Sequence, residues 1–279
     1  MLNRLSGLVL SRPQQTAVAV AIGLAAAGVA GLWLLPLLRD QAALVIAPTR
    51  PSTPVPPAQA AWVSPLQGKC SHFDRILQRR LRHLQGSLRQ RTRHLQIDPS
   101  NYGERHSVDG YGNRVDTQPS VVVLHETVYG IGSAIHTFTT HHPEDADQVS
   151  YHILIGEDGQ IVQAVDPSRR AFGAGHSAFR GRWVVLNRDL SGSVNNFALH
   201  VSLETPLDGE DDAPEHSGYS SQQYDALAVV LADWIHRYRI PIDHITTHRH
   251  VDLGGERADP RSFDWGALQT RLAALGVAC

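Results

Sequence analysis

Cysteine is scarce in this sequence, and its two occurrences lie far apart. The chain of 279 residues contains two cysteines, which excludes a cysteine-based zinc knuckle because such a site needs clustered thiols. Cys70 and Cys279 bracket the part of the chain that we expect to be soluble. In an oxidising compartment they would form one disulfide that ties its ends together. Two unpaired thiols are the alternative, and the sequence leaves both open.

An excess of charge of either sign is also missing. The formal net charge is -2, so no global electrostatic argument favours nucleic acid as a partner. Internal repeats are absent as well. The chain after its N-terminal segment is long enough for one sizeable hydrophobic core, and we therefore expect one domain with an N-terminal extension.

The sequence does contain one long hydrophobic run, residues 16–38, which has no charged residue. At about 1.5 Å of rise per residue, a helix of this length crosses the roughly 30 Å hydrocarbon core of a bilayer. Arg4 and Arg12 precede the run, whereas Arg39 is followed directly by Asp40. This bias favours an N-terminus inside the cell. The prediction is a single-pass anchor in the inner (cytoplasmic) membrane, with the remainder on the periplasmic side.

The main alternative is a cleaved signal peptide, which would leave the protein secreted. Its apolar region would normally have only about 7 to 15 residues. A lipid anchor is not expected, because Cys70 comes long after the run and follows Lys69. Residues 47–61 are rich in proline and have the composition of an extended spacer. The predicted segments are a cytoplasmic segment 1–15, an anchor 16–38, a linker 39–64, an N-terminal extension 65–119 and a main domain 120–279.

The N-terminal extension is expected to contain a basic amphipathic helix within residues 73–96. Apolar side chains fall there at helical spacing among many arginines. These apolar residues are Phe73, Ile76, Leu77, Leu81, Leu84 and Leu88. One interpretation is a helix packed on the domain with a solvated basic face. The other is contact with an anionic envelope polymer or with lipid headgroups.

Strand and helix patterns alternate through the main domain. Residues 121–124 form an apolar, mostly β-branched run that predicts a buried strand leading to His125. Asp158-Gly159 between two apolar runs predicts a hairpin turn, and Ser220 with Gln223 forms a capping-box pattern. The predicted strands are 121–124, 151–155, 160–165, 198–204 and 245–248, and the predicted helices are 133–141, 224–238 and 264–275. The pattern predicts an α/β fold with a mixed central β-sheet flanked by helices.

Three side chains stand where strand ends or an adjacent loop would bring them together. The chain has 16 histidines, so histidine alone is a weak signal. His125 and His248 each end a predicted strand, and Asp259 lies in a loop just before Pro260. Two imidazoles and one carboxylate with an open fourth position are the ligand set of a catalytic zinc ion. His250 is an alternative to His248, because two residues apart on an extended strand would point to the same side.

Several segments, in their order and spacing, resemble the type-2 N-acetylmuramoyl-L-alanine amidases. They are VVVLHET (121–127), SYHILIGEDGQIVQAV (150–165), GAGHS (173–177), NNFALHVSLE (195–204), ITTHRHVD (245–252) and ERADPRSFDW (256–265). The resemblance covers about residues 120–275. It implies zinc ligands at His125, His248 and Asp259, and the pair His248-Arg249 fits the family pattern better than His250 does. It also implies hydrolysis of the amide between the lactyl group of muramic acid and L-alanine in peptidoglycan or a muropeptide.

The same resemblance implies catalytic roles for further residues. Arg257 matches a basic family position that would stabilise an oxyanion or the leaving group. Tyr151 matches a tyrosine that hydrogen-bonds the attacking water, although a tyrosine that merely packs is the alternative. Many members carry a catalytic glutamate where this chain has Ser202. Strand alternation puts Glu204 on the same face, so a displaced carboxylate there is one candidate base. Glu126 is a second candidate, although it should face away from His125.

Substrate contacts are expected from His176, Asn195 and Ser202. Ser177 and Asn196 are further candidates, although asparagine in a turn usually bonds the backbone first. The leading hypothesis is a zinc-dependent amidase with a peptidoglycan or muropeptide substrate, a membrane anchor and no nucleic-acid partner. The rival is a non-catalytic peptidoglycan-binding module, for which Ser202 is the main argument. All three expected metal ligands are present, which argues against this rival.

Overall fold

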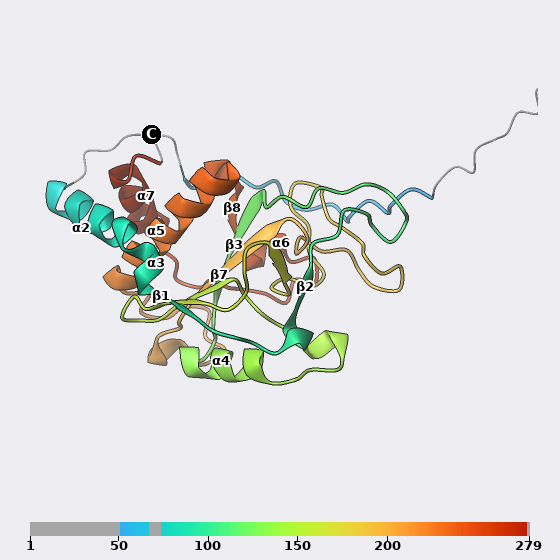
Figure 1. Cartoon of the computed structure of the whole chain (residues 1–279), viewed down its shortest axis with the longest axis horizontal. Helices are drawn as coiled ribbons and strands as arrows, with labels where there is room; N and C mark the ends of the chain where they lie inside the picture. The colour runs from blue at the N-terminus through green and yellow to red at the C-terminus, as the bar shows by residue number, and fades with distance from the viewer. Residues whose placement is uncertain (1–50, 67–73, 278–279) are drawn as a thin grey trace, which may run out of the picture. The chain divides into compact units, whose positions relative to one another are not determined.

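The computed structural model describes residues 51–66 and 74–277 (Figure 1). The hydrophobic run 16–38, Cys70 and Cys279 lie outside these residues. No helix within the described ranges combines the length and the apolar character needed to cross a bilayer. Residues 50–279 form one compact unit by their contacts.

The core of the protein is a mixed six-stranded sheet in the order β1-β5-β4-β7-β3-β8. Its strands are β1 (Thr92–His94), β3 (Val121–Glu126), β4 (Ile153–Ile155), β5 (Ile161–Gln163), β7 (Ala198–Leu203) and β8 (Ile245–Thr247). All neighbours are parallel except β4 and β5, which form the hairpin that Asp158-Gly159 predicts. β2 (Tyr102–Glu104) and β6 (Arg169–Ala171) make a small antiparallel sheet beside it.

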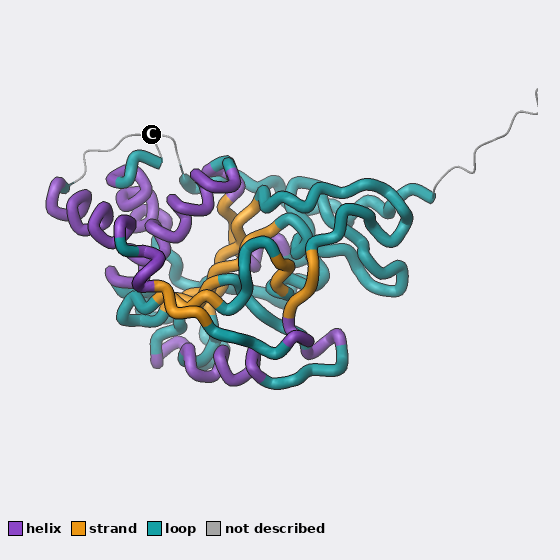
Figure 2. Tube along the Cα trace, viewed as in Figure 1, coloured by secondary structure: helices purple, strands orange, loops and turns teal. Residues whose placement is uncertain are grey.

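The long helices gather mainly to one side of the strands, and loops fill much of the other side (Figure 2). The α-helices are α2 (Arg75–Gly86), α3 (Leu88–Arg91), α4 (Ile131–Thr139), α5 (Ser221–Tyr238), α6 (His248–Val251) and α7 (Trp265–Ala274). Short 3-10 turns are η1 (Pro99–Asn101), η2 (Asp145–Asp147), η3 (Leu207–Gly209) and η4 (Ile242–His244). The α5 capping box is formed as predicted, since Ser220 Oγ accepts from Gln223 N while Gln223 Oε1 accepts from Ser220 N.

Strand alternation divides the sheet into an apolar face and a face that carries polar groups. On β3 and β7, the residues Val122, Leu124, Leu199, Val201 and Leu203 join the core formed with α5 and α7. The residues between them belong to the opposite face, where apolar clusters around Phe179 and Phe138 surround a polar centre. That centre contains His125, which is paired in register with Ser202 on β7. Every residue of both strands is buried.

The basic segment differs from the single helix predicted over residues 73–96. α2 ends at Gly86, a second short helix follows, and Thr92–His94 becomes the edge strand β1, paired with β5. Leu81 packs fully buried against Val229 and Ala274, which confirms the packed-helix interpretation. A helix of the predicted length would deprive β5 of one of its two neighbours, and strand pairing is a long-range requirement that helical spacing does not reveal.

The structure describes residues 51–64 of the expected linker 39–64, and these residues contact the domain. From Pro51 the chain lies along the domain without regular secondary structure. Gln59 Nε2 donates to the Ala178 carbonyl at 3.0 Å, and Trp62 Nε1 donates to the Asp243 carbonyl at 2.9 Å. Trp183 Nε1 donates to the Pro54 carbonyl at 2.8 Å. We call residues 51–66 the strap. Its prolines keep the backbone extended and leave carbonyl oxygens free to accept hydrogen bonds from the domain, as Pro54 O does.

Candidate metal centre

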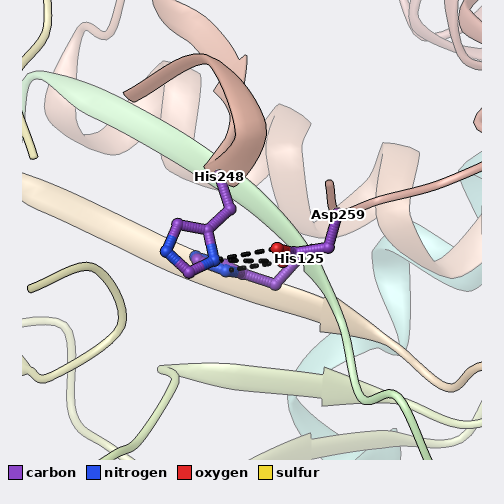
Figure 3. Close-up of side chains that lie close together, drawn as sticks. All are labelled: His125, His248 and Asp259. Carbon is purple, nitrogen blue, oxygen red and sulfur yellow. Dashed lines mark hydrogen bonds and ion pairs between the residues drawn. The ribbon is translucent and has the colours of Figure 1, made fainter. Parts of the chain in front are cut away.

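Three side chains from different elements converge at the polar centre of the sheet (Figure 3). His125 lies on β3, His248 opens α6, and Asp259 lies in the loop between α6 and α7. Asp259 Oδ2 is 3.2 Å from His125 Nδ1, and Asp259 Oδ1 is 3.0 Å from His248 Nδ1. One donor atom of each residue lies within 4.8 Å of the others. The predicted grouping is therefore confirmed.

The local backbone explains why His248, and not His250, faces this centre. β8 ends at Thr247, whose side chain accepts from His250 N and caps the short helix α6. On a helix, residues two apart point in nearly opposite directions. His250 accordingly packs on Trp62, with ring centroids 4.6 Å apart. The expectation that the two histidines share a side of an extended strand is wrong.

Asp259 is held by backbone contacts on both sides of its loop. Its carbonyl accepts from Arg249 N at 3.0 Å, which fixes the loop against α6. Before it, the Asp252 carboxylate accepts from Glu256 N and Arg257 N. After it, Arg261 is buried and donates to the Glu126 carboxylate on β3. The loop is thus tied to the strand that carries His125.

Burial and charge set the protonation of the three side chains. Burial, with a contribution from His248, lowers the pKa of His125 to about 4. Burial by itself would raise the pKa of Asp259, but its close contacts with His125 and His248 hold the pKa below its usual range. Near neutral pH the centre therefore contains a neutral His125 and an ionised Asp259, which are the forms that bind a metal ion.

Tyr151 lies directly beside this centre. Its ring stacks on that of His125, with centroids 4.3 Å apart and an interplanar angle of 25°. Its other neighbour is Phe138, which it meets edge-on at 5.6 Å. Burial raises the pKa of Tyr151, and the negative charge of Asp259 raises it further. The phenol is therefore protonated and can act as a hydrogen-bond donor.

Arg257 lies in the exposed part of the Asp259 loop, and its charge reaches the centre. The guanidinium lowers the pKa values of His125 and Tyr151, although other causes are larger for both. Arg257 also lines a cavity of about 690 Å³ together with Arg249, Trp62 and Trp265. A cation whose charge acts on His125 and Tyr151 suits the stabilisation of negative charge that develops there.

The structure does not bring Glu204 into the metal centre. Its carboxylate accepts from Ile131 N at 2.6 Å and from Glu157 N at 2.8 Å. It follows the last residue of β7 and satisfies the first backbone N–H of α4, a typical N-terminal capping interaction. These are the contacts of a structural carboxylate, and they do not support the displaced base predicted at Glu204. Strand alternation identifies a face of the sheet but not what lies above it.

The second candidate base, Glu126, belongs to a separate buried network. It accepts from Arg261 Nε at 2.5 Å and from Tyr219 Oη at 2.6 Å. His216 Nε2 lies 3.2 Å from the same carboxylate. Glu126 thus holds loops together on the side of β3 away from His125, as strand geometry predicts.

The predicted substrate-binding residues do not form one surface. His176 is exposed near Trp183, with ring centroids 6.2 Å apart. Asn195 is buried and its Oδ1 accepts from Ala174 N at 3.0 Å. Ser202 is fully buried, and its Oγ has no hydrogen-bond partner among the described residues.

Ser177 and Asn196 also bond the backbone. Ser177 Oγ donates to Ala174 O at 3.0 Å, and Asn196 Nδ2 donates to His106 O at 2.9 Å. Of all these candidates, His176 is the exposed one.

Sequence reasoning missed His200 as a member of the site. Its Nδ1 lies 2.9 Å from His125 Nε2, the ring nitrogen that faces away from Asp259. Alternation along residues 198–204 does place His200 on the face of Ser202. The contact with His125 was not predicted, because it depends on the parallel register of β3 and β7.

A buried set of two imidazoles and a carboxylate at neighbouring strand ends is the donor set of zinc hydrolases. The sequence pattern of the N-acetylmuramoyl-L-alanine amidase family matches residues 115–262. The chain belongs to this family, and it is an amidase.

Individual relatives agree with this assignment. The 1,6-anhydro-N-acetylmuramyl-L-alanine amidase AmpD of Salmonella typhimurium is 30% identical over 172 residues, which are 57% of this chain and 83% of the relative. AmpD of Citrobacter freundii is 32% identical over 169 residues, 55% of this chain and 81% of the relative. The crystal structure of a selenomethionine derivative of AmpD superposes with a TM-score of 0.50 at 27% identity and covers 65% of this chain and 94% of its own.

Proposed function

We propose that this protein is a zinc-dependent amidase that cleaves the bond between the lactyl group of N-acetylmuramic acid and L-alanine in peptidoglycan or its fragments. The convergence of His125, His248 and Asp259 in a member of this amidase family carries the proposal. The similar AmpD proteins are named as 1,6-anhydro-N-acetylmuramyl-L-alanine amidases. This supports muropeptide fragments that carry the anhydro sugar as substrates to test first.

The donor atoms fit a zinc ion. His125 Nδ1 is buried and faces Asp259 Oδ2 at 3.2 Å without the alignment of a hydrogen bond. A buried ring nitrogen without a partner is costly, by about 1–3 kcal/mol, and coordination of a cation would satisfy it. His125, His248 and Asp259 would hold the ion, with one position left for substrate or water. Zinc there supplies Lewis acidity, which polarises a carbonyl and lowers the pKa of water.

The surrounding residues would position substrate and stabilise charge. Tyr151, protonated and stacked on His125, can donate a hydrogen bond to an oxygen atom at the centre. Arg257 can approach the oxyanion that forms when water attacks the amide carbonyl. Collapse of that intermediate breaks the C–N bond, and the proton that the attacking water loses is taken up by the leaving nitrogen of L-alanine. Among the three clustered side chains that the structure describes, Asp259 is the one that carries a carboxylate.

A non-catalytic binding module remains the rival function because of one observation. Ser202 lies in register with His125, and Glu204 is occupied as a helix cap, so neither presents a carboxylate to the centre. The rival predicts a protein that binds muropeptides and releases nothing.

For location, we propose that residues 16–38 form a single-pass anchor in the cytoplasmic membrane with the amidase on the periplasmic side. Secretion after cleavage of the run is the alternative. The length and apolar character of this run support the anchor. Fractionation of cells that produce the full chain, with protease added to intact spheroplasts, tests it. Protein that stays in the soluble periplasmic fraction would favour cleavage, and protection from protease would contradict the orientation.

The activity is tested with the purified full chain. Metal analysis should find about one zinc per chain, and His125→Ala should lose it. Incubation with anhydro-muropeptides and, separately, with intact sacculi should release stem peptides that mass spectrometry detects. Bound zinc without any release would support the binding module instead. Release by zinc-free protein would rule out the metal mechanism.

A further inference from the structure

His200 is a fully buried histidine on β7, and it contacts the proposed metal ligand His125. His125 Nε2 and His200 Nδ1 are 2.9 Å apart, and the rings are tilted by 42°. The opposite ring nitrogen of His125, Nδ1, is the one that faces Asp259. The two nitrogens of a neutral imidazole have opposite roles, since one carries the proton and the other carries a lone pair.

Only one proton arrangement of this pair leaves His125 able to bind a metal ion at Nδ1. If His200 donates from Nδ1, the single proton of neutral His125 lies on its own Nδ1 and blocks the ligand position. If His125 donates from Nε2 to His200 Nδ1, the lone pair of His125 Nδ1 faces the centre. A metal-binding histidine commonly donates its second N–H to a neighbouring acceptor, and this contact fixes both tautomer and ring orientation.

Several contacts fix His200 at this position. The strand backbone is fixed first, because His200 N donates to His152 Nδ1 at 3.0 Å and His152 N donates to His200 O at 3.0 Å. The His152 ring lies parallel to that of His200, with an angle of 6° between the planes. Arg105 Nη2 approaches His152 Nε2 at 3.3 Å and also donates to Ala198 O at 2.9 Å.

Gly173 completes the cradle around the His200 ring. A Cβ atom on Gly173 would lie 2.4 Å from His200 Nδ1 and 2.5 Å from its Cγ. Side chains essentially never approach so closely, so residue 173 has to lack a side chain for His200 to reach His125. The lack of a Cβ at Gly173 therefore leaves room for His200 Nδ1, the nitrogen that contacts His125.

The position of His200 also has a cost. His200 Nε2 is buried and has no hydrogen-bond partner among the described residues. In the arrangement that frees His125 Nδ1, this nitrogen carries the proton of His200 and leaves it unsatisfied. A buried polar group without a partner costs about 1–3 kcal/mol, and such exceptions call for an explanation. An apolar side chain would fill the same space without this cost, but it would leave His125 Nε2 without an acceptor.

We propose that His200 is a positioning residue of the metal site: it accepts the Nε2–H of His125 and thereby turns the Nδ1 lone pair toward the ion. The proposal rests on the zinc site proposed above. It does not make His200 a metal ligand or a catalytic residue. It assigns part of the metal affinity of this chain to a buried contact on the far side of the ligand.

The test measures zinc affinity of the full chain, after metal removal, by competition with a chromophoric chelator. His200→Ala should weaken zinc binding about 10- to 100-fold, the usual effect of losing such a partner. His200→Asn should retain most of the affinity, because Asn Oδ1 can occupy the place of the His200 Nδ1 acceptor. The matched control is His250→Asn, whose ring packs on Trp62 instead of the metal ligands; its affinity should equal that of the wild type.

A second pair of variants, with substitutions at Gly173, tests the same contact between His200 and His125. Gly173→Ala should weaken zinc binding in the wild type, because its Cβ displaces the His200 ring. In the His200→Ala background the same substitution should have no further effect, since the ring is gone. Gly175→Ala is the matched control in the same loop, where a Cβ meets nothing within 4 Å. Thermal unfolding of each metal-free variant shows whether it is folded, and an unfolded His200→Ala leaves the test to His200→Asn and Gly173→Ala.

The outcomes separate this inference from the proposed function. If wild-type protein binds no zinc, the proposed function fails. If the wild type binds zinc and folded His200→Ala binds it equally well, the positioning role of His200 is wrong while the zinc site stands. Equal losses from Gly173→Ala with and without the His200 ring would also overturn it, because the loss would then not act through His200.

Discussion

Glu126 and Arg261 form a buried ion pair, with Arg261 Nε 2.5 Å from Glu126 Oε1, that ties the loop of Asp259 to the strand of His125. Glu126 directly follows His125 in the sequence, and Arg261 lies two residues after Asp259. Arg261 also donates to the carbonyls of Asp211, Ala213 and Gly209. The pair therefore fixes the distance between ligands that are far apart in the chain.

Arg261→Met should destabilise the fold and disturb the metal centre together. Loss of one partner leaves the Glu126 charge buried and uncompensated, which typically costs about 3–5 kcal/mol. We expect a loss of that size in the free energy of unfolding of the metal-free protein, measured with denaturant. Zinc affinity should fall as well, because Asp259 lies two residues before Arg261.

A double-mutant comparison controls this prediction. Glu126→Gln combined with Arg261→Met removes both charges, so it should recover part of the stability that Arg261→Met alone loses. If the two substitutions simply add, the pair is not coupled as the structure indicates.

Glu204→Gln should reduce stability and leave zinc binding unchanged. The Glu204 carboxylate accepts from Ile131 N and Glu157 N, and the amide keeps one oxygen acceptor but replaces the other by a donor. We expect a loss of about 1 kcal/mol, the typical value for a helix cap. Denaturant unfolding and zinc titration measure the two quantities separately. A large loss of turnover with unchanged stability would instead restore Glu204 as a catalytic carboxylate.

The sequence predicted the parts of the site that depend on short stretches of chain. The β-branched run before His125 predicts a buried strand, and β3 is one. The Asp-Gly turn, the Ser220 cap and the mixed sheet are likewise confirmed, because each depends on local geometry or on a pattern within one segment. The grouping of the three expected ligands also followed from strand ends and the family resemblance.

Long-range contacts account for what was not predicted. Alternation placed His200, Ser202 and Glu204 on one face, but the register with β3 decides that Ser202 lies beside His125. Glu204 lies beyond the strand end, where α4 begins. Residues 47–61 were expected to form an extended spacer because their proline-rich composition describes backbone stiffness, and composition does not reveal that the Gln59 side chain donates to the Ala178 carbonyl.

Trp62→Ala should destabilise the domain through the strap. The Trp62 indole donates to the Asp243 carbonyl and packs against His250 and Trp265. Its loss removes a hydrogen bond and half-buried aromatic area, so we expect about 1–3 kcal/mol, within the ordinary range of destabilising substitutions. Denaturant unfolding measures the change. Val63→Ala, at a residue that is 81% exposed, is the control and should have almost no effect. Equal stability of Trp62→Ala and the wild type would show that the strap is not docked in solution.

The metal-free protein should lose stability in acid partly through His152. Burial, with a contribution from the Arg105 charge, lowers the pKa of His152 to about 3, against an ordinary 6.5. Between these values the unfolded chain binds a proton that the folded chain refuses, so stability falls as the pH drops from about 6.5 toward 3. One such group contributes a slope of up to about 1.4 kcal/mol per pH unit.

His152→Asn should flatten this acid dependence, because asparagine does not titrate while its Oδ1 can still accept from His200 N. The free energy of unfolding, measured with urea between pH 7 and pH 4 after metal removal, gives the two slopes. At pH 7 the variant should have a lower free energy of unfolding than the wild type. This difference should become smaller by pH 4, because only the wild type loses stability through protonation of His152 in the unfolded chain. His83→Asn, at an exposed position on α2, should keep the wild-type slope. Parallel curves for His152→Asn and the wild type would show that His152 does not carry the acid sensitivity, and His125 and His200, whose pKa values burial also lowers, would then be the groups to examine.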